Sequence, residues 1–156
     1  MDNKVTAQML IAIWNEHTIP DLPTLKKVID SNYVCHDPNT VKDFGKGPDG
    51  FKARVKFFTA AFPDLHIAVE ETMDGKSEEP CKICGSTYRV IQRWMVTATH
   101  KGELFGFPPT NKPIHCEGVS IGHYSDDGKL LEDYVAWDSA NLLAQIGGEE
   151  HQAAAS

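Results

Sequence analysis

Asp138 is the residue whose possible chemistry stands out first. It lies in the stretch LEDYVAWDSANLLAQIG, residues 131–147, where a strand pattern gives way to a helical one. A carboxylate buried in an apolar pocket becomes a stronger base, because loss of solvent disfavours its charged form, and it can then remove a proton from carbon. Strand alternation places Asp138 on the same face as Glu132, Tyr134 and Ala136. Asp is equally a favoured N-cap for the helix that follows, so both roles stay open.

Three histidines and one arginine are the other candidates for acid/base or charge-stabilising roles. His123 ends an expected strand; facing inward it could orient a substrate or transfer a proton, and facing the turn it would be a partly exposed histidine. His36 in CHDP and His100 in THKG could line the mouth of a pocket or bond to loop backbone. Arg93 could stabilise a developing enolate, or pair with a carboxylate such as Glu117.

Cysteine spacing raises the question of a metal. Cys81 and Cys84 form a Cys-x-x-Cys pair, and His115 with Cys116 could complete a zinc site. Adjacent strand residues point to opposite faces, however, so His115 and Cys116 cannot easily bind one ion. A redox role would need a helix after the pair, and a strand is expected instead. We therefore expect no metal, and with no phosphate-binding or nucleotide motif present we expect no cofactor.

Length and charge narrow the class of protein. The chain of 156 residues is long enough for one domain, which we expect over residues 1–148 with a disordered tail at 149–156. A net charge of −7 argues against nucleic acid or an anionic membrane as a partner. No apolar stretch could span a bilayer, and the N-terminus lacks the basic start of a signal peptide. These features predict a cytoplasmic protein with reduced thiols.

The periodicity of apolar residues changes from helical to alternating along the chain. Helices are expected over 4–17, 22–33, 48–62 and 139–146, and strands over 65–73, 86–100, 114–124 and 130–137, with a short extended piece near 33–40. Helices followed by antiparallel strands indicate an α+β fold. Helices packed on one face of a long bent sheet would enclose a cone with an apolar interior. Trp14, Phe58 and Phe62 are most simply core there, although such a core also suits a flat aromatic ligand.

Several stretches together are typical of one known family. They are HDP, FPDLHIAVEE, VIQRWMVTATHKGELFGFPPTNKPI and SDDGKLLEDYVAWDSANLLAQIG. From about residue 33 to 147 the chain resembles the SnoaL-like polyketide cyclases, which belong to the nuclear-transport-factor-two-like α+β cone superfamily. The resemblance implies a curved antiparallel sheet wrapped around N-terminal helices. It also implies a cofactor-free enzyme that closes a ring by intramolecular aldol condensation.

The resemblance also suggests roles for particular residues. It places the general acid/base at Asp138 and an assisting histidine at His123, and both His36 and His100 match the family pattern. Tyr134 replaces the family's tryptophan, and the loop with the cysteine pair is not part of that pattern. The expected substrate-binding residues are His36, His100, Tyr134, Arg93, Trp14, Phe58 and Phe62.

Three functions remain open at this level. The first is acid/base catalysis on a small hydrophobic or aromatic carbonyl substrate. The second is epoxide hydrolysis or double-bond isomerisation on the same fold, and the third is a non-catalytic ligand-binding or dimerisation module. A homodimer or tetramer is expected, with Val135 and Trp137 as contacts because they lie opposite in phase to Asp138. The deciding observation is whether Asp138 points into the cavity or at the N–H groups of the last helix.

Overall fold

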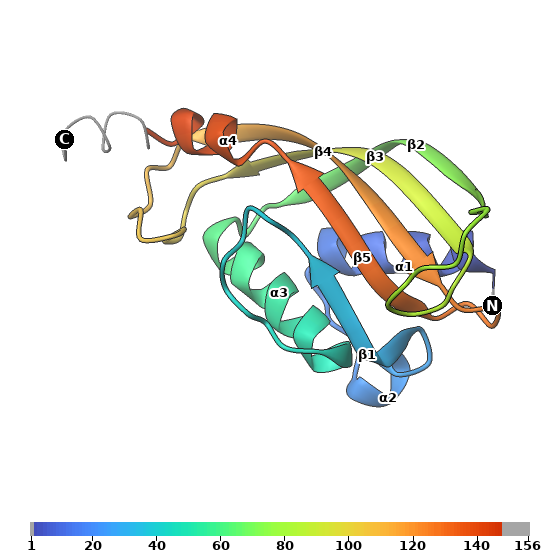
Figure 1. Cartoon of the computed structure of the whole chain (residues 1–156). Coiled ribbons are helices and arrows are strands. Elements are labelled where there is room, and N and C mark those ends of the chain that lie inside the picture. Colours follow the sequence, from blue (N-terminus) through green and yellow to red (C-terminus); the bar gives the residue numbers. More distant parts are fainter. Residues whose placement is uncertain (1, 148–156) are drawn as a thin grey trace.

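The computed structural model describes residues 2–147. In it, helices pack against one face of a curved sheet (Figure 1). The helices are α1 Asn3–Glu16, α2 Leu22–Leu25, α3 Gly47–Ala61 and α4 Ser139–Gln145. The strands are β1 Ile29–His36, β2 His66–Lys76, β3 Tyr88–Thr99, β4 Pro113–Tyr124 and β5 Leu130–Trp137. The expected tail, residues 149–156, lies outside the described residues, and the domain boundary at 148 stays a prediction.

The sheet has the strand order β1-β5-β4-β3-β2 and does not close into a barrel. Neighbouring strands from β5 to β2 run antiparallel, whereas β1 runs parallel to β5 at the edge. The α+β cone expected from the sequence is therefore confirmed, with a mixed sheet in place of a purely antiparallel one. Because β1 and β5 are about a hundred residues apart, as in the Val34–Glu132 pair, local pattern carries no signal for this pairing.

The segment after Pro20 differs from the expected helix over 22–33. Asp21 caps α2 through a hydrogen bond from the Thr24 N–H, as its position predicts, but the helix ends at Leu25. The chain then turns into β1, where Ile29 pairs with Leu130 of β5. Pairing with the sheet satisfies the backbone and buries the β-branched Ile29, and this tertiary gain outweighs the helical spacing.

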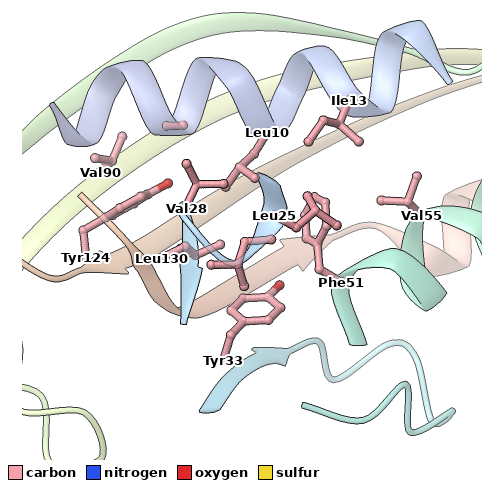
Figure 2. Packing of buried hydrophobic residues seen from close by; sticks show 12 residues of the cluster. Leu10, Ile13, Leu25, Val28, Tyr33, Phe51, Val55, Val90, Tyr124 and Leu130 are labelled. Carbon is pink, nitrogen blue, oxygen red and sulfur yellow. The ribbon is translucent and has the colours of Figure 1, made fainter. Parts of the chain in front are cut away.

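Buried side chains form two hydrophobic clusters along the cone. One joins α1, the α2–β1 segment and α3 to the start of β3, the end of β4 and the start of β5, and it includes Leu10, Leu25, Tyr33, Val55 and Leu130 (Figure 2). The other joins the C-terminal half of α3 to α4 and to the far ends of β3 and β4. Trp14 packs against both clusters. The space between them is where a cavity opens.

Within residues 2–147, no helix combines the length and the apolar character that crossing a membrane requires. The cytoplasmic location expected from the sequence stays a prediction.

Candidate active site

An apolar cavity of about 150 Å³ lies between the helices and the inner face of the sheet. An apolar cavity of roughly this volume can hold a benzene ring. Trp14, Phe58 and Phe62, the aromatic residues expected to contact a substrate, are all in its wall. Polar or ionisable groups in the wall are few: Tyr33, Cys35, Arg54, Gln92, Cys116, Ser120, Tyr124 and Asp133, with the indole N–H groups of three tryptophans.

Strand β5 presents its odd-numbered residues to the cavity. Asp133, Val135 and Trp137 line it, so the face expected to look inward, that of Glu132 and Tyr134, looks outward. The expectation that Val135 and Trp137 form a subunit contact is wrong, because these two large apolar side chains line the inner cavity and not the outer face of the sheet. Their hydrophobicity sets the phase of the strand.

Asp138 lies past the end of β5 and caps the last helix. Its Oδ1 accepts a hydrogen bond of 3.0 Å from the Asn141 N–H, and its side chain is exposed. It is not in the cavity wall. The expected cavity position of Asp138 is therefore wrong, and the alternative reading as an N-cap describes its geometry.

His100 and Arg93 also lie away from the cavity. His100 is fully buried against the Phe62 ring, and its Nδ1 accepts a hydrogen bond of 3.3 Å from the Thr110 N–H. Burial lowers the pKa of His100, which favours a neutral structural imidazole. Arg93 pairs with a carboxylate, as the alternative reading allowed, but its exposed partner is Glu71 at 2.9 Å.

His36, His123 and Tyr134 gather on the outer face of the sheet, opposite the cavity. The His36 and Tyr134 rings stack with centroids 4.3 Å apart, and His123 lies 5.0 Å from the same tyrosine. His36 Nε2 is 2.7 Å from Glu132 Oε2, and Glu132 is only 2% exposed. The structure thus brings these expected site residues together, but not with Asp138 and not in the cavity.

Asp133 is the carboxylate that the cavity holds, and the sequence reasoning did not single it out. Burial raises its pKa to about 7, and the nearby positive charge of Arg54 only partly opposes this effect. Of the residues 2–147, none is seen to donate a hydrogen bond to it. A carboxylate in this state is a proton acceptor and donor matched to neutral pH.

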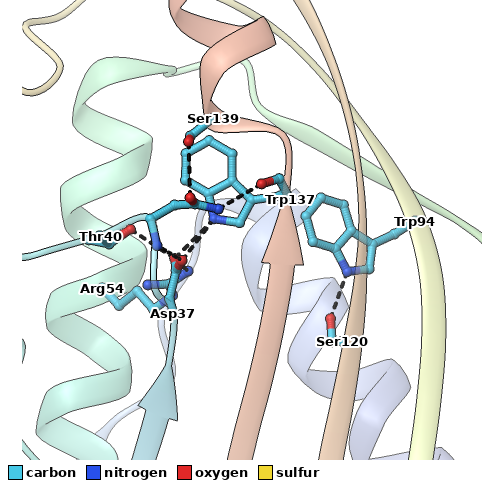
Figure 3. Close-up of polar contacts among 8 residues, drawn as sticks. Asp37, Thr40, Arg54, Trp94, Ser120, Trp137 and Ser139 are labelled. Atoms are coloured by element: carbon cyan, nitrogen blue, oxygen red, sulfur yellow. Dashed lines mark hydrogen bonds and ion pairs between the residues drawn. The ribbon is translucent and has the colours of Figure 1, made fainter.

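Arg54 lines the cavity together with Asp133, close enough for its charge to act on the pKa of that carboxyl. An ion pair with Asp37 fixes its guanidinium (Figure 3). Arg54 Nη2 donates to Asp37 Oδ2 at 2.7 Å, and the Trp137 Nε1–H donates to both oxygens of Asp37 at 3.0 and 3.1 Å. The Thr40 hydroxyl donates to the same carboxylate at 2.8 Å. Burial acts to raise the pKa of Asp37, but the hydrogen bonds from Arg54 and Trp137 outweigh it, so the pKa is lowered.

Two further polar residues of the cavity wall are Trp94 and Cys35. The Trp94 Nε1–H donates to the Ser120 hydroxyl at 2.6 Å across β3 and β4 (Figure 3). Burial raises the pKa of Cys35 to about 12, which removes it as a thiolate nucleophile. The ionisable groups suited to chemistry in this wall are therefore Asp133 and Arg54.

The sequence contained a signal for both missed residues. Arg54 stands on the apolar stripe of α3 with Phe51, Val55 and Phe58, so a charged residue is directed at the core. Asp133 shares its strand face with larger apolar residues, which marks that face as the buried one. A charged residue on either stripe is an exception that calls for a function.

This combination defines a class of protein: an α+β cone with an apolar cavity and one desolvated acid/base group. The family model of the SnoaL-like polyketide cyclases matches residues 4–146. The chain belongs to this family. A comparison with curated proteins finds no match.

Solved structures of similar fold cover nearly the whole chain. The proposed polyketide cyclase IdmH from Streptomyces antibioticus is 25% identical, with a TM-score of 0.70 over 94% of this chain and 99% of its own. A proposed polyketide cyclase from Acidithiobacillus ferrooxidans is 27% identical, with a TM-score of 0.70 over 93% of both chains. AclR from Streptomyces galilaeus, described as a proposed hydroxylase, is 26% identical, with a TM-score of 0.65 over 94% of this chain and 96% of its own.

Proposed function

We propose that this protein closes a ring in a small polyketide-type carbonyl compound without a cofactor, using Asp133 as the general base. Asp133 removes a proton from a carbon activated by neighbouring carbonyls. The resulting enolate carbon attacks a carbonyl carbon of the same molecule, which forms the new carbon–carbon bond and leaves an alkoxide. The proton held by Asp133 then returns to the alkoxide oxygen, so the carboxylate is regenerated.

The observation that carries this proposal is the position of Asp133: a carboxylate with a pKa of about 7 in the wall of an apolar, aromatic-lined cavity. A base is most effective when its pKa lies near the working pH. The apolar wall also excludes water, which would otherwise solvate the enolate and compete for the proton. Support for the substrate class comes from the family and from the size and aromatic lining of the cavity.

Arg54 is the group placed to stabilise the enolate. Its guanidinium carries a fixed positive charge and lines the cavity, while its side chain is only 10% exposed. The ion pair with Asp37 holds it in one orientation, so little reorganisation is needed when negative charge develops on the substrate oxygen. Asp37 itself is in the wall of a smaller neighbouring hollow and not of the main cavity.

Epoxide opening is a second candidate, favoured by one observation. Arg54 stands between two carboxylates whose pKa values are shifted in opposite directions, Asp133 upward and Asp37 downward. In such a pair, a protonated Asp133 would donate to the epoxide oxygen while Asp37 takes a proton from the attacking water. The position of Asp37 outside the main cavity makes this the weaker candidate. Styrene oxide in ¹⁸O-labelled water tests it, because hydrolysis would place ¹⁸O in the diol.

The first experiment tests whether Asp133 is the general base of the proposed ring closure. 5-Nitrobenzisoxazole is a flat aromatic probe that opens when a general base removes its ring C–H proton, and the phenolate product absorbs visible light. We expect Asp133→Asn to lower kcat/KM for this probe by roughly 100-fold or more. The rate of the intact chain should rise with pH through about 7, as Asp133 loses its proton.

Asp138→Asn is the matched control, since it makes the same change at a residue outside the cavity wall. It should keep the rate within about twofold, because Asn caps a helix about as well as Asp. Loss of activity in Asp138→Asn with retention in Asp133→Asn would return the catalytic role to Asp138. An intact chain that binds the probe but does not open it would favour the non-catalytic binding module.

We also propose that the chain forms a homodimer or tetramer, as expected from the sequence. Light scattering coupled to size-exclusion chromatography measures this oligomeric state. With Val135 and Trp137 inside the cone, any sheet contact between subunits would use the outer face. Exposed apolar residues on that face include Met73, Ile91 and Val119.

A further inference from the structure

The loop between β2 and β3 folds back over the outer face of the sheet, at the ends of β4 and β5 (Figure 1). It carries Cys81 and Cys84, which the proposed reaction does not use. Beneath it lie His123 of β4 and Glu132 of β5, which are direct cross-strand partners. One donor atom from each of these four residues lies within 4.8 Å of the others. We propose that these four residues bind one zinc ion that fastens the loop to the sheet.

The donor set has the chemistry of a structural zinc site. Two cysteine sulfurs, one imidazole nitrogen and one carboxylate oxygen are the ligand types that tetrahedral Zn²⁺ takes in proteins. A tetrahedral ion with bonds of about 2.3 Å to sulfur and 2.0 Å to nitrogen separates two such ligands by roughly 3.5 Å. Cys84 Sγ lies 3.8 Å from His123 Nδ1, and Cys81 Sγ lies 3.2 Å from Glu132 Oε1. These two distances lie near that value, and all four donor atoms lie within 4.8 Å of one another.

The sequence argued against a zinc site because its nearest second ligand pair could not bind one ion, but the tertiary structure supplies a different pair. His115 and Cys116, the nearest candidates in sequence for a second ligand pair, point to opposite faces of β4. Cys116 lines the inner cavity, whereas the cysteine pair sits outside. The actual second pair comes from two neighbouring strands, where His123 and Glu132 lie side by side on the outer face. Two short-range features, a loop turn and a cross-strand pair, together supply the four ligands.

The turn that holds the cysteines is shaped for two ligands on one side. The Gly85 N–H donates to the Cys81 carbonyl at 2.8 Å, and the Cys81 N–H donates to the Ser86 carbonyl at 2.8 Å. Gly85, directly after Cys84, has a φ of +73°, a conformation that favours glycine. The backbone therefore turns back at Gly85, and both cysteines are held over the sheet.

Glu132 is oriented as a metal ligand would be. Its Oε2 is held by His36 Nε2 at 2.7 Å and by the Tyr134 hydroxyl at 3.3 Å, while Oε1 faces Cys81. Hydrogen bonds that fix the free oxygen of a ligating carboxylate are a regular feature of metal sites. A carboxylate that is 2% exposed needs compensation for lost solvent, and a dication between it and two sulfurs would add to the hydrogen bonds it already accepts.

Metal analysis of the full-length chain, produced without a polyhistidine tag and kept reduced, tests the site. We expect roughly one zinc ion per chain by mass spectrometry, and Cys81→Ser and Cys84→Ser should reduce this to below about 0.1. Cys116→Ser and His115→Gln are the matched controls and should keep the zinc, whereas His123→Gln should lose it. Zinc retained in both Cys81→Ser and Cys84→Ser would overturn the proposal.

A second measurement does not depend on the folding of any variant. The intact chain, stripped of metal with a chelator, is titrated with Co²⁺. The expected result is a one-to-one endpoint, with the visible bands of tetrahedral cobalt and a near-ultraviolet thiolate-to-cobalt band; zinc should then displace the cobalt and raise Tm. Absence of these bands, or a disulfide between Cys81 and Cys84 in the reduced preparation, would overturn the site.

Discussion

At the scale of single residues, two carboxylates in and next to the cavity lie where their environment changes their chemistry. Asp133 lies in an apolar wall that disfavours its charge, whereas Asp37 accepts five hydrogen bonds from four donor residues, which favour its charge. Two carboxylates, one paired with Arg54 and the other only within reach of its charge, therefore have pKa values shifted in opposite directions. This separation is what lets one act as a base near pH 7 while the other positions Arg54.

The raised pKa of Asp133 predicts a pH-dependent effect on stability. Its pKa of about 7 in the folded chain lies above the value of about 3.9 in the unfolded chain, so its stabilising contribution is full below pH 3.9 and is lost as pH rises through 7. Asp133→Asn should therefore raise the free energy of unfolding at pH 8 by about 1–3 kcal/mol and change it little at pH 4. Urea denaturation at both pH values measures this. Equal effects of Asp133→Asn at the two values would contradict the assignment.

At the scale of elements, caps and strand phase decide which side chains reach the site. Asp2, Asp21 and Asp138 each cap a helix by accepting a backbone N–H from the first turn. In β5 the residue before the cap, Trp137, turns inward and binds Asp37. The junction of β5 with α4 thus fixes the indole that holds the Arg54–Asp37 pair. Asp138 contributes to the site through the backbone it anchors.

The capping role of Asp138 predicts a graded response to substitution. Asp138→Ala should lower the free energy of unfolding by about 1 kcal/mol, because the Asn141 N–H loses its acceptor, whereas Asp138→Asn should stay within a few tenths of a kcal/mol. Urea denaturation with an unchanged m-value measures both. An Asp138→Asn protein as unstable as Asp138→Ala would argue against the cap.

At the scale of the whole molecule, the cone stays partly hollow because large aromatic rings pack between its elements. Trp14 packs edge-on against Phe51, and Phe58 packs edge-on against Trp137, so large rings bridge the helices and the sheet. At Gly118 the absence of a side chain leaves room for the Trp94 ring, which a Cβ atom would overlap. These contacts hold helices and sheet apart around the cavity, and the two hydrophobic clusters on either side supply the stability.

The clusters beside the cavity predict that two valines differ in their contribution to the free energy of unfolding. Val55 of α3 is 1% exposed, whereas Val5 of α1 is 49% exposed. Val55→Ala should lower the free energy of unfolding by about 2 kcal/mol, since it removes buried methyl groups that neighbours cannot replace. Val5→Ala, with the same change in helix propensity, should stay within about 0.5 kcal/mol. Thermal or urea unfolding compares them, and similar losses in both would mean that α3 is not part of the core as described.

The amino-acid sequence by itself determined the family and most of the elements, because helical spacing, strand alternation and caps such as Asp21 are local. The exception is the segment 22–33, where the helix ends at Leu25 and β1 begins at Ile29. The HDP, FPDL and GFPPT stretches indicate the family, because they too are local sequence motifs. Only the tertiary structure decided which face of β5 is inside, where β1 pairs, and that His123 and Glu132 lie beneath Cys81 and Cys84. The physical reason is the period of two in a strand: a shift of one residue exchanges the faces, and burial against distant elements selects between them. Asp133 lies in the cavity wall because the odd-numbered face of β5 is inside, whereas Asp138 lies past the end of the strand and caps α4.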